Sequence, residues 1–455
     1  MQMNLSTIAQ ILHLQQTFVT DAVVQDVVFD SRKVTPNSLF VPLVAQRDGH
    51  DFVPQALAAG AVATLWQSDH PLPAGHHENY LVVDDPLSAI QTLSQAYLHE
   101  VAPKVVAITG SNGKTTTKDM IAAVLSQKYQ VAKTPTNFNN EIGVPLTILQ
   151  MAPDTQILVV ELGMDRPGQL TKLSALVQPD IAVITMIGEA HIEFFGTRAK
   201  IADAKMEIVS SLKPSGLFIY NGSEPLLVQR AAAVTQKQAT FGRASTLDIY
   251  PSTIQTYQTY TTFRINLVPE FEFRLPLMGD YNVDNALAAI LVGKQFQVDF
   301  QKIQEALAHF QPTKNRTQWL QAQNGAQILS DVYNANPTAM IDVIQNFQKI
   351  LTTGRRILVL GDMLELGEQA PQLHAEVAQA IDLQAIAQVY LYGSEMRALR
   401  DALPSQLSVQ WYSRDQKVKL IQDLQEILQP QDLILLKASN GLHLDEVVQA
   451  LQKSN

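Results

Sequence analysis

Short, uninterrupted runs of apolar residues recur along the chain, each followed by a stretch with helical periodicity. In the middle of the chain these runs are VVAIT, ILVVEL and IAVITMI, and the stretch after the first carries Met120, Ile121, Val124 and Leu125 on one helical face. Runs of this length are typical of strands buried on both faces. Strands that alternate with helices predict an α/β fold with mainly parallel sheets. The segment 250–277 alternates apolar with polar residues instead, which predicts two or three antiparallel strands at the edge of the same domain.

The strand and helix pattern restarts twice, which predicts three domains. Residues 1–102 combine β-branched runs with alanine-rich stretches and predict a small α/β domain. Residues 103–313 predict a central domain with a parallel sheet. Four further apolar runs, in AQILSDV, RRILVLGDM, QVYLYGS and DLILLKASNG, predict a third parallel sheet over 314–455. We place the hinge before it at 311–315. A chain of 455 residues is long enough for three such units.

Composition excludes several classes of protein. The chain carries 33 basic and 43 acidic side chains, a formal charge of −10, without a basic run. This balance argues against duplex nucleic acid or an anionic membrane as the main partner. It has no cysteine, so disulfides and thiolate metal sites are excluded. No apolar stretch approaches the roughly 18 residues of a membrane span, and the N-terminus lacks the features of a secretion signal. We therefore expect a globular protein of the cytoplasm.

The most specific local motif is TGSNGKTTT, which directly follows the run VVAI and precedes a helical stretch. Gly110 and Gly113 allow the backbone to curl so that its N–H groups face a polyphosphate, and the helix N-terminus adds positive potential. Lys114 can reach the terminal phosphates, and the Thr115 hydroxyl can bind Mg²⁺. Because Ile108 stands where the long form of this motif has its first glycine, the loop is the shorter GxxGKT variant. An ordinary glycine turn beside an unrelated lysine is the alternative.

Three further polar residues are candidates for the same site. Two lie at or just after the ends of predicted strands, and the third lies on a predicted helix. Glu161 closes ILVVEL, His191 follows IAVITMI, and Lys205 lies in the helical stretch DAKMEI. Open α/β sheets bind their ligands at the carboxyl ends of the strands, where Glu161 would suit magnesium. Taken alone, a strand-terminal Glu caps its strand, a histidine forms structural hydrogen bonds and a helical lysine is solvated. Their convergence on the glycine loop favours function.

Polar residues outside this set are also candidates. The cluster TNFNN holds Asn137 and Asn140, which cap turns or bind a substrate. Asp331 opens DVYNANP at another strand end and can accept hydrogen bonds from ribose hydroxyls, although a polar turn is the alternative. Arg316 follows the predicted hinge, where a planar guanidinium can clamp a phosphate across the domain boundary; a surface arginine is the alternative, and the position favours the clamp.

Taken together, ten motifs in order along the chain resemble the Mur ligase family. They are TGSNGKTTT, NFNNEIGVPLTIL, ELGMDRPGQL, GEAHIEFFGT, AKMEI, GDYNVDNALAA, NRTQW, DVYNANPTAM, LGDMLELG and KASNGLHLDEVV. DSRKVTPNSLFVPL and RDGHDFVPQALAAGA extend the resemblance into the first domain, so it covers residues 24–448. It implies a UDP-sugar-binding N-terminal domain, a central P-loop ATPase domain and a Rossmann-like C-terminal domain. NNEIGVPLT and DVYNANP are the motifs that discriminate within the family.

The implied activity is that of an ATP-dependent amide ligase of peptidoglycan precursor synthesis, and so of cell shape and division. The resemblance implies that it adds D-Ala-D-Ala to UDP-N-acetylmuramoyl-tripeptide through an acyl phosphate, as a monomer. It places Lys114 on the β- and γ-phosphates, Thr115 and Glu161 on one Mg²⁺, and His191 with Glu161 on a second. Lys205 matches the family lysine that is carbamylated by CO₂ and then serves the second metal.

The resemblance also implies two larger sets of contacts. The nucleotide set is Gly110, Ser111, Asn112, Gly113, Lys114, Thr115, Thr116, Asn282, Asn285, Arg316 and Asp331. The substrate set is Ser31, Arg32, Asn137, Asn140, Asn334 and Asn336. Two positions depart from the family pattern: Tyr281 replaces the histidine of GxHNxxN, beside the adenine, and Asn440 replaces the arginine of KxSR.

Two alternatives remain open at this stage. Another Mur ligase or a folylpolyglutamate synthetase would share the GxxGKT loop but add a single amino acid. A binding protein gated by nucleotide would use the loop as a switch, without an acceptor.

Overall fold

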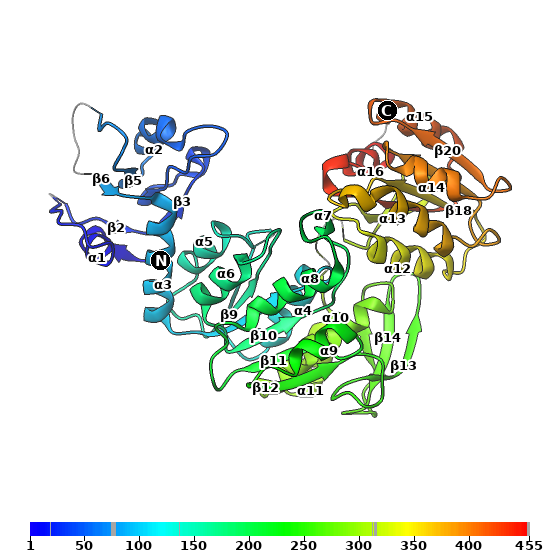
Figure 1. Cartoon of the computed structure of the whole chain (residues 1–455), viewed down its shortest axis with the longest axis horizontal. Helices are drawn as coiled ribbons and strands as arrows, with labels where there is room; N and C mark the ends of the chain where they lie inside the picture. The colour runs from blue at the N-terminus through cyan, green and yellow to red at the C-terminus, as the bar shows by residue number, and fades with distance from the viewer. Residues whose placement is uncertain (19, 74–78, 136, 312, 314–315, 453–455) are drawn as a thin grey trace.

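The computed structural model describes residues 1–18, 20–73, 79–135, 137–311, 313 and 316–452. Figure 1 shows three α/β bodies, with the N-terminal and C-terminal ones at opposite ends of the long axis and the central one between them. The predicted fold class is confirmed. Pro312 and residues 314–315 of the predicted hinge lie outside the described residues. Within the described ranges, no helix is long and apolar enough to cross a membrane.

The N-terminal body contains a parallel sheet in the order β3-β4-β5-β6. Its strands are β3 (Asp26–Val28), β4 (Ser38–Phe40), β5 (Ala63–Gln67) and β6 (Tyr80–Val83). A short antiparallel pair, β1 (Met3–Asn4) with β2 (Val23–Val24), lies beside it. The helices are α1 (Leu5–Ile11), α2 (Val53–Ala58) and α3 (Pro86–Val101), of which α3 packs against α5 of the central body.

The central body is built on a six-stranded, wholly parallel sheet in the order β12-β11-β10-β7-β9-β8. Its strands are β7 (Lys104–Thr109), β8 (Val131–Lys133), β9 (Ile157–Glu161), β10 (Ile181–Ile184), β11 (Leu217–Asn221) and β12 (Lys237–Phe241). The helices are α4 (Lys114–Leu125), α5 (Gly143–Leu149), α6 (Gln169–Val177), α7 (Ile192–Phe195), α8 (Arg198–Met206), α9 (Pro225–Ala231), α10 (Tyr281–Gln295) and α11 (Phe300–Ala308).

Alternate residues of β7 enter two different cores. Val106 and Ile108 pack with α4 and α10, whereas Val105 and Ala107 pack with residues of α5 and α6. Both faces of the strand are therefore covered, which explains why the run VVAI has no polar residue. In this sheet β7 lies between β9 and β10; the chain passes from β7 outward to the edge strand β8, and from β9 back across β7 to β10, so the carboxyl end of β7 opens where the strand order reverses.

The segment 250–277 forms the predicted antiparallel strands. They are β13 (Pro251–Thr256), β14 (Thr261–Ile265) and β15 (Phe273–Leu275), which pair in that order as a separate sheet. The inward residues Phe263, Ile265 and Phe273 pack into the core that contains α4 and α10.

The C-terminal body has a six-stranded sheet in the order β16-β17-β21-β18-β19-β20, parallel except for β16. Its strands are β16 (Gln318–Gln321), β17 (Gln327–Asp331), β18 (Arg356–Gly361), β19 (Gln388–Tyr392), β20 (Ser408–Tyr412) and β21 (Leu433–Lys437). The helices are α12 (Pro337–Gln348), α13 (Ala370–Glu376), α14 (Met396–Ala402), α15 (Lys417–Ile427) and α16 (Asp445–Gln452).

Candidate active site

A cavity of about 1210 Å³ lies where the three bodies meet. It is lined by the glycine loop and Glu161 of the central body, by Gln91 on α3, and by Arg316 and Asp331 of the C-terminal body. The carboxyl ends of β7, β9 and β17 therefore face one space, as expected for a ligand site of open α/β sheets.

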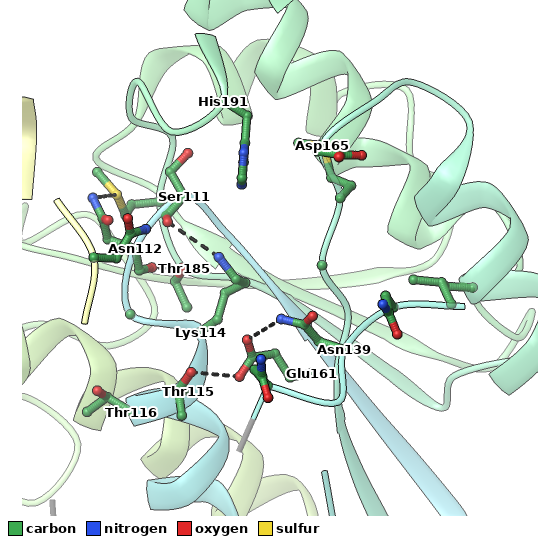
Figure 2. Close-up of a pocket in the computed structure, with 18 of the residues that line it drawn as sticks. Ser111, Asn112, Lys114, Thr115, Thr116, Asn139, Glu161, Asp165, Thr185 and His191 are labelled. Atoms are coloured by element: carbon green, nitrogen blue, oxygen red, sulfur yellow. Dashed lines mark hydrogen bonds between the residues drawn. The ribbon is translucent and has the colours of Figure 1, made fainter. Parts of the chain in front are cut away.

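The glycine loop runs from the end of β7 to the start of α4, and both of its glycines have positive φ. Gly113 has φ of 81°, and a Cβ at this position would lie 2.4 Å from Asn285 Oδ1. Lys114 folds back over the loop, with Nζ donating to the carbonyl of Gly110 at 2.8 Å and to that of Ser111 at 3.4 Å; the contact with Ser111 is drawn in Figure 2. Burial lowers the pKa of Lys114, although Glu161 acts in the opposite direction. A partly desolvated amine that rests on backbone carbonyls is poised to exchange them for phosphate oxygens.

Substituting alanine for Gly113 is expected to destabilise the protein and to weaken nucleotide binding. The left-handed backbone alone costs a residue with a Cβ about 1–2 kcal/mol. Asn285 cannot swing away freely, because its Oδ1 accepts from Thr117 Oγ1 at 3.0 Å and its Nδ2 donates to Asn282. Thermal unfolding and titration with ADP measure the two effects. Gly168→Ala is the control, since Gly168 also has positive φ (85°) but an added Cβ there meets no atom within 4 Å.

Glu161 is the anionic centre of the site. It is 2% exposed, and its two carboxylate oxygens accept hydrogen bonds from Thr115 Oγ1 and Asn139 Nδ2, both at 2.8 Å (Figure 2). Among the ion pairs between described residues, none includes Glu161. A buried carboxylate held only by neutral donors, next to a threonine hydroxyl, is a suitable pair of oxygen ligands for Mg²⁺.

His191 joins the central body to the C-terminal body. It starts α7 in a left-handed conformation (φ 64°), and Figure 2 shows its ring directed into the pocket. Its Nδ1 lies 2.5 Å from Oε2 of Glu365, and this imidazole lowers the pKa of the Glu365 carboxyl. A carboxylate at Nδ1 leaves Nε2 available, which is how metal-binding histidines are commonly oriented.

Lys205 lies on α8 and is 2% exposed. Burial, with a smaller effect of the Lys114 charge, holds its pKa well below the usual range of a lysine. Its Nζ has no hydrogen bond or ion pair with any residue that the structure describes. A buried amine without an anionic partner is more stable in its neutral form, which is nucleophilic.

The C-terminal wall of the cavity carries alternating charges. The guanidinium of Arg316 stacks over the ring of Tyr333, 4.1 Å from its centroid, and its Nε is buried without a hydrogen-bond partner. Asp331 accepts from the backbone N–H of Thr317 at 3.1 Å and is paired with Lys437 Nζ. An unpaired buried guanidinium N–H that lines a cavity indicates a missing anionic or polar ligand.

Two predicted nucleotide residues on α10 line the cavity from behind the glycine loop. Asn282 Nδ2 donates to the carbonyl of Met278 at 2.9 Å, and its Oδ1 accepts from Asn285. Tyr281, at the position of the family histidine, lies 3.3 Å from Thr317 Oγ1, and burial raises the pKa of its phenol. This side chain therefore links α10 to the first described residues of the C-terminal body.

The other predicted nucleotide residues belong to the loop itself, and Ser111, Asn112 and Thr116 all line the cavity. The structure does not bring all predicted substrate residues there. Ser31 donates to Gln55 within the N-terminal body, and Arg32 is 82% exposed and pairs with Asp30; neither lines the cavity.

The remaining predicted substrate residues lie near the cavity in different ways. Asn137, Asn140 and Asn334 line it, and Asn140 also accepts from the backbone N–H of Gly143 at the start of α5. Asn336 is 1% exposed and hydrogen-bonds to the glycine loop.

A histidine and aspartate cluster in the N-terminal body does not fit a metal ion. Asp48, His50 and His70 bring their ligand atoms within 4.8 Å of one another. However, His50 Nε2 accepts from the backbone N–H of Gln67 at 3.2 Å, so Nδ1 must carry the proton that it shares with Asp48. His70 is held by Asp48 and Asp69, which raise its pKa. The cluster is a hydrogen-bond network around a histidine that favours its charged form.

Three residues of the site had not been singled out from the sequence. Asn139, between the predicted Asn137 and Asn140, donates to Glu161. Glu365 lies within LGDMLELG and meets His191 across the body boundary. Lys437 ends β21 in register with Asp331 at the end of β17, so its position follows from the parallel pairing of these two strands.

A phosphate-type glycine loop, a buried carboxylate with a hydroxyl beside it, and a second domain that offers Arg316 and Asp331 define a class of nucleotide-dependent enzymes with a site between domains. The Mur ligase middle domain model matches residues 108–293, and the Mur ligase glutamate ligase domain model matches residues 315–440. The chain therefore belongs to the Mur ligase family.

Similar proteins cover the whole chain. It is 40% identical over 439 residues to the UDP-N-acetylmuramoyl-tripeptide–D-alanyl-D-alanine ligase of Bacillus subtilis, covering 95% of this chain and 94% of that one. The ligase of the same name from Escherichia coli is 34% identical, with 95% of each chain covered. Among solved structures, MurF from Acinetobacter baumannii has a TM-score of 0.89 at 28% identity, covering 100% of this chain and 99% of that one. MurF from Thermotoga maritima in complex with ADP has a TM-score of 0.82 at 28% identity, covering 94% and 97%.

Proposed function

We propose that this protein is the ATP-dependent ligase that adds D-Ala-D-Ala to UDP-N-acetylmuramoyl-tripeptide, in peptidoglycan precursor synthesis. The observation that carries the proposal is the 40% identity to a ligase of that name over 95% of the chain, which includes all three bodies. The folylpolyglutamate synthase of Mycobacterium tuberculosis has a TM-score of 0.61 at 16% identity and shares the fold alone. No observation favours the single-amino-acid alternative or a nucleotide-gated binding protein.

The reaction must overcome the low reactivity of a carboxylate toward an amine. A carboxylate oxygen of the tripeptide attacks the γ-phosphorus of ATP, the bond to the β-phosphate oxygen breaks, and ADP leaves. The amine of D-Ala-D-Ala then attacks the acyl phosphate carbonyl; an amide bond forms, and phosphate and a proton leave. This chemistry needs alignment and charge stabilisation rather than a nucleophilic side chain of the enzyme.

The chain's own cations are arranged for the first step. Lys114 binds the β- and γ-phosphates in place of the carbonyl of Gly110, and Arg316 reaches the γ-phosphate from the C-terminal body. Asp331 accepts from the ribose hydroxyls, and Asn282 and Asn285 contact the adenine side. The backbone of residues 110–116 surrounds the phosphates. The buried, unpaired Nε of Arg316 supports its assignment.

The oxygen and nitrogen ligands of the site fit two Mg²⁺ ions. Thr115 and Glu161 would hold one, and Glu161 with His191 and carbamylated Lys205 the other. When bound, such ions neutralise charge on the transferring phosphoryl group. Carbamylation joins the neutral Lys205 amine to CO₂, forms an N–C bond and releases a proton, so a neutral side chain becomes an anion. The burial of Lys205 without an anionic partner supports this step.

The remaining predictions are part of the same proposal. Asn137, Asn140 and Asn334, with Ser31 and Arg32 at the UDP end, form the substrate set, and Asn336 contributes to it through its hydrogen bonds with the glycine loop. Domains at 1–102, 103–313 and 314–455 enclose the reaction, because an acyl phosphate hydrolyses in contact with water. We propose a cytoplasmic monomer.

Phosphate release measured with alternative acceptors tests the function. With ATP, Mg²⁺ and UDP-N-acetylmuramoyl-tripeptide, phosphate should appear with D-Ala-D-Ala and stay at background with single amino acids, and the product should gain the mass of the dipeptide. Release with one amino acid but not with the dipeptide would establish the sibling activity. ADP formation that is the same with and without an acceptor would point to a nucleotide switch instead.

A further inference from the structure

The side chain of Asn112, at the apex of the glycine loop, is turned toward the C-terminal body. Its Nδ2 donates to Asn336 Oδ1 at 3.1 Å, and its Oδ1 accepts from Asn336 Nδ2 at 2.7 Å. This reciprocal amide pair joins residues that are 224 positions apart in the chain. Because both polar atoms of Asn112 are engaged, its side chain has a partner other than the nucleotide.

Asn336 has a second function that fixes its position. Its Oδ1 also accepts from the backbone N–H of Ala339 at 3.0 Å, so it is the N-cap of α12. The residue is 1% exposed, and an amide buried with all its oxygen lone pairs engaged has one stable orientation. The glycine loop therefore contacts the rigid first turn of a helix.

A second contact from the central body reaches the same turn. Glu189, in the segment after β10, accepts from both the backbone N–H and Oγ1 of Thr338, at 3.1 and 2.8 Å. A carboxylate at this place satisfies a free N–H of α12 and interacts favourably with the helix dipole. The N-terminus of α12 is therefore capped by Asn336 of the C-terminal body and by Glu189 of the central body.

The glycine loop is tied to the same segment on its other side. Thr185 Oγ1 donates to the backbone carbonyl of Asn112 at 2.5 Å, and the backbone N–H of Ser111 donates to the carbonyl of Met186 at 2.9 Å. The loop apex, residues 185–189 and the start of α12 therefore form one hydrogen-bonded unit, which we call the apex unit.

We propose that Asn112 and Asn336 are positioning residues, whose amide pair couples the shape of the glycine loop to the placement of the C-terminal body. The inference rests on the proposed function. Lys114 belongs to the loop, whereas Arg316 and Asp331 belong to the C-terminal body. A pair that holds the loop apex to α12 sets the distance between these two groups of ligands, and misplacement by about 1 Å can cost about 10²-fold in rate.

The chain offers a matched control for simple docking of the two bodies. Asn346, nearer the end of α12, donates to Asp280 Oδ1 of the central body at 3.2 Å and is 5% exposed. It also joins the bodies through an amide, but it makes no contact with the glycine loop. Asn346→Ser and Asn336→Ser therefore remove similar contacts, and serine at position 336 can still cap α12.

A double-mutant cycle tests the coupling. We expect Asn112→Ala and Asn336→Ser each to lower kcat about tenfold with a smaller change in KM for ATP, and the double variant to be no slower than either. Asn112→Ala combined with Asn346→Ser should instead multiply its single effects. Tm should fall equally in Asn336→Ser and Asn346→Ser, so the difference in kcat is not one of folding.

Three outcomes would overturn the inference. The first is an unchanged kcat in Asn336→Ser, and the second is a loss of kcat of about 100-fold in the Asn112 and Asn336 double variant. The third is a double variant of Asn112→Ala with Asn346→Ser whose kcat is no lower than that of the slower single variant. A parallel cycle on the dissociation constant of ADP separates this inference from the proposed function. If the wild type fails to use D-Ala-D-Ala, the proposed function is wrong. The dissociation constants of ADP still test the coupling: the double variant of Asn112 and Asn336 should change this constant no more than the single variants do, whereas independent residues would multiply their effects.

Discussion

Replacing Lys114 with methionine is expected to lower kcat/KM for ATP by about 10³-fold, the scale typical of removing a charge that stabilises a transferring phosphoryl group. The loss should not come from unfolding. Burial already lowers the pKa of Lys114, so its charged form is partly desolvated, and an apolar chain of similar length removes that cost. We expect the Tm of Lys114→Met to equal or exceed that of the wild type.

Steady-state kinetics and thermal unfolding of the same preparation check this prediction. Lys104→Met is the control, because Lys104 begins the strand at whose end the glycine loop starts, is 64% exposed in its side chain and pairs with Asp180. Its activity should stay near that of the wild type. An active Lys114→Met would remove the phosphate role, and an inactive variant with a strongly lowered Tm would assign this lysine to the fold instead.

The strands of the fold were predictable because their signal is local. VVAIT, ILVVEL and IAVITMI became β7, β9 and β10, and 250–277 became β13 to β15. A strand buried on both faces is an unbroken apolar run, so it can be recognised from its own residues without knowing which strands lie beside it. The approach of Glu161 and Asp331 to one cavity followed from the same pattern, because parallel strands present their carboxyl ends at one edge of a sheet.

Contacts between bodies were not predictable, since no periodicity encodes them. The contacts of Glu365 with His191 and of Asn336 with Asn112 depend on how two bodies with separate sheets meet. Among the asparagines of TNFNN, Asn139 was not identified for a different reason. Asn139 reaches Glu161 because the chain turns before α5, and a loop rich in asparagine carries no sign of which side chain points inward.

Lys437 is intermediate between the strands, which local sequence predicts, and the contacts between bodies, which it does not. It was visible as a polar end to the run LILL, and its register with Asp331 places both at one edge. Pairing β17 with β21 across more than 100 residues required a sheet order that alternation alone does not fix. The residue is therefore recoverable from sequence only after the topology is known.

Replacing Lys205 with alanine is expected to lower kcat at least about 10²-fold, because in the proposed mechanism the carbamate of Lys205 is a ligand of the second metal ion. The physical basis is the buried amine itself: burial first and the Lys114 charge second hold its pKa well below the usual range, which favours the neutral amine that reacts with CO₂. Wild-type enzyme in ¹³C-enriched bicarbonate should show a carbamate carbon by NMR that the variant lacks.

Chemical rescue distinguishes a carbamate from a structural lysine. Lys205→Ala opens a space where a short carboxylic acid such as acetate can place the missing oxygens, so acetate should restore activity about tenfold, whereas bicarbonate should restore none because the amine is gone. Lys200→Ala on the same helix is the control; Lys200 is exposed, and neither its activity nor its response to acetate should differ from the wild type. A fully active Lys205→Ala variant, or a wild type whose rate does not depend on dissolved CO₂ and which shows no carbamate signal, would remove the carbamate from the mechanism and leave His191 and Glu161 as the residues for the second ion.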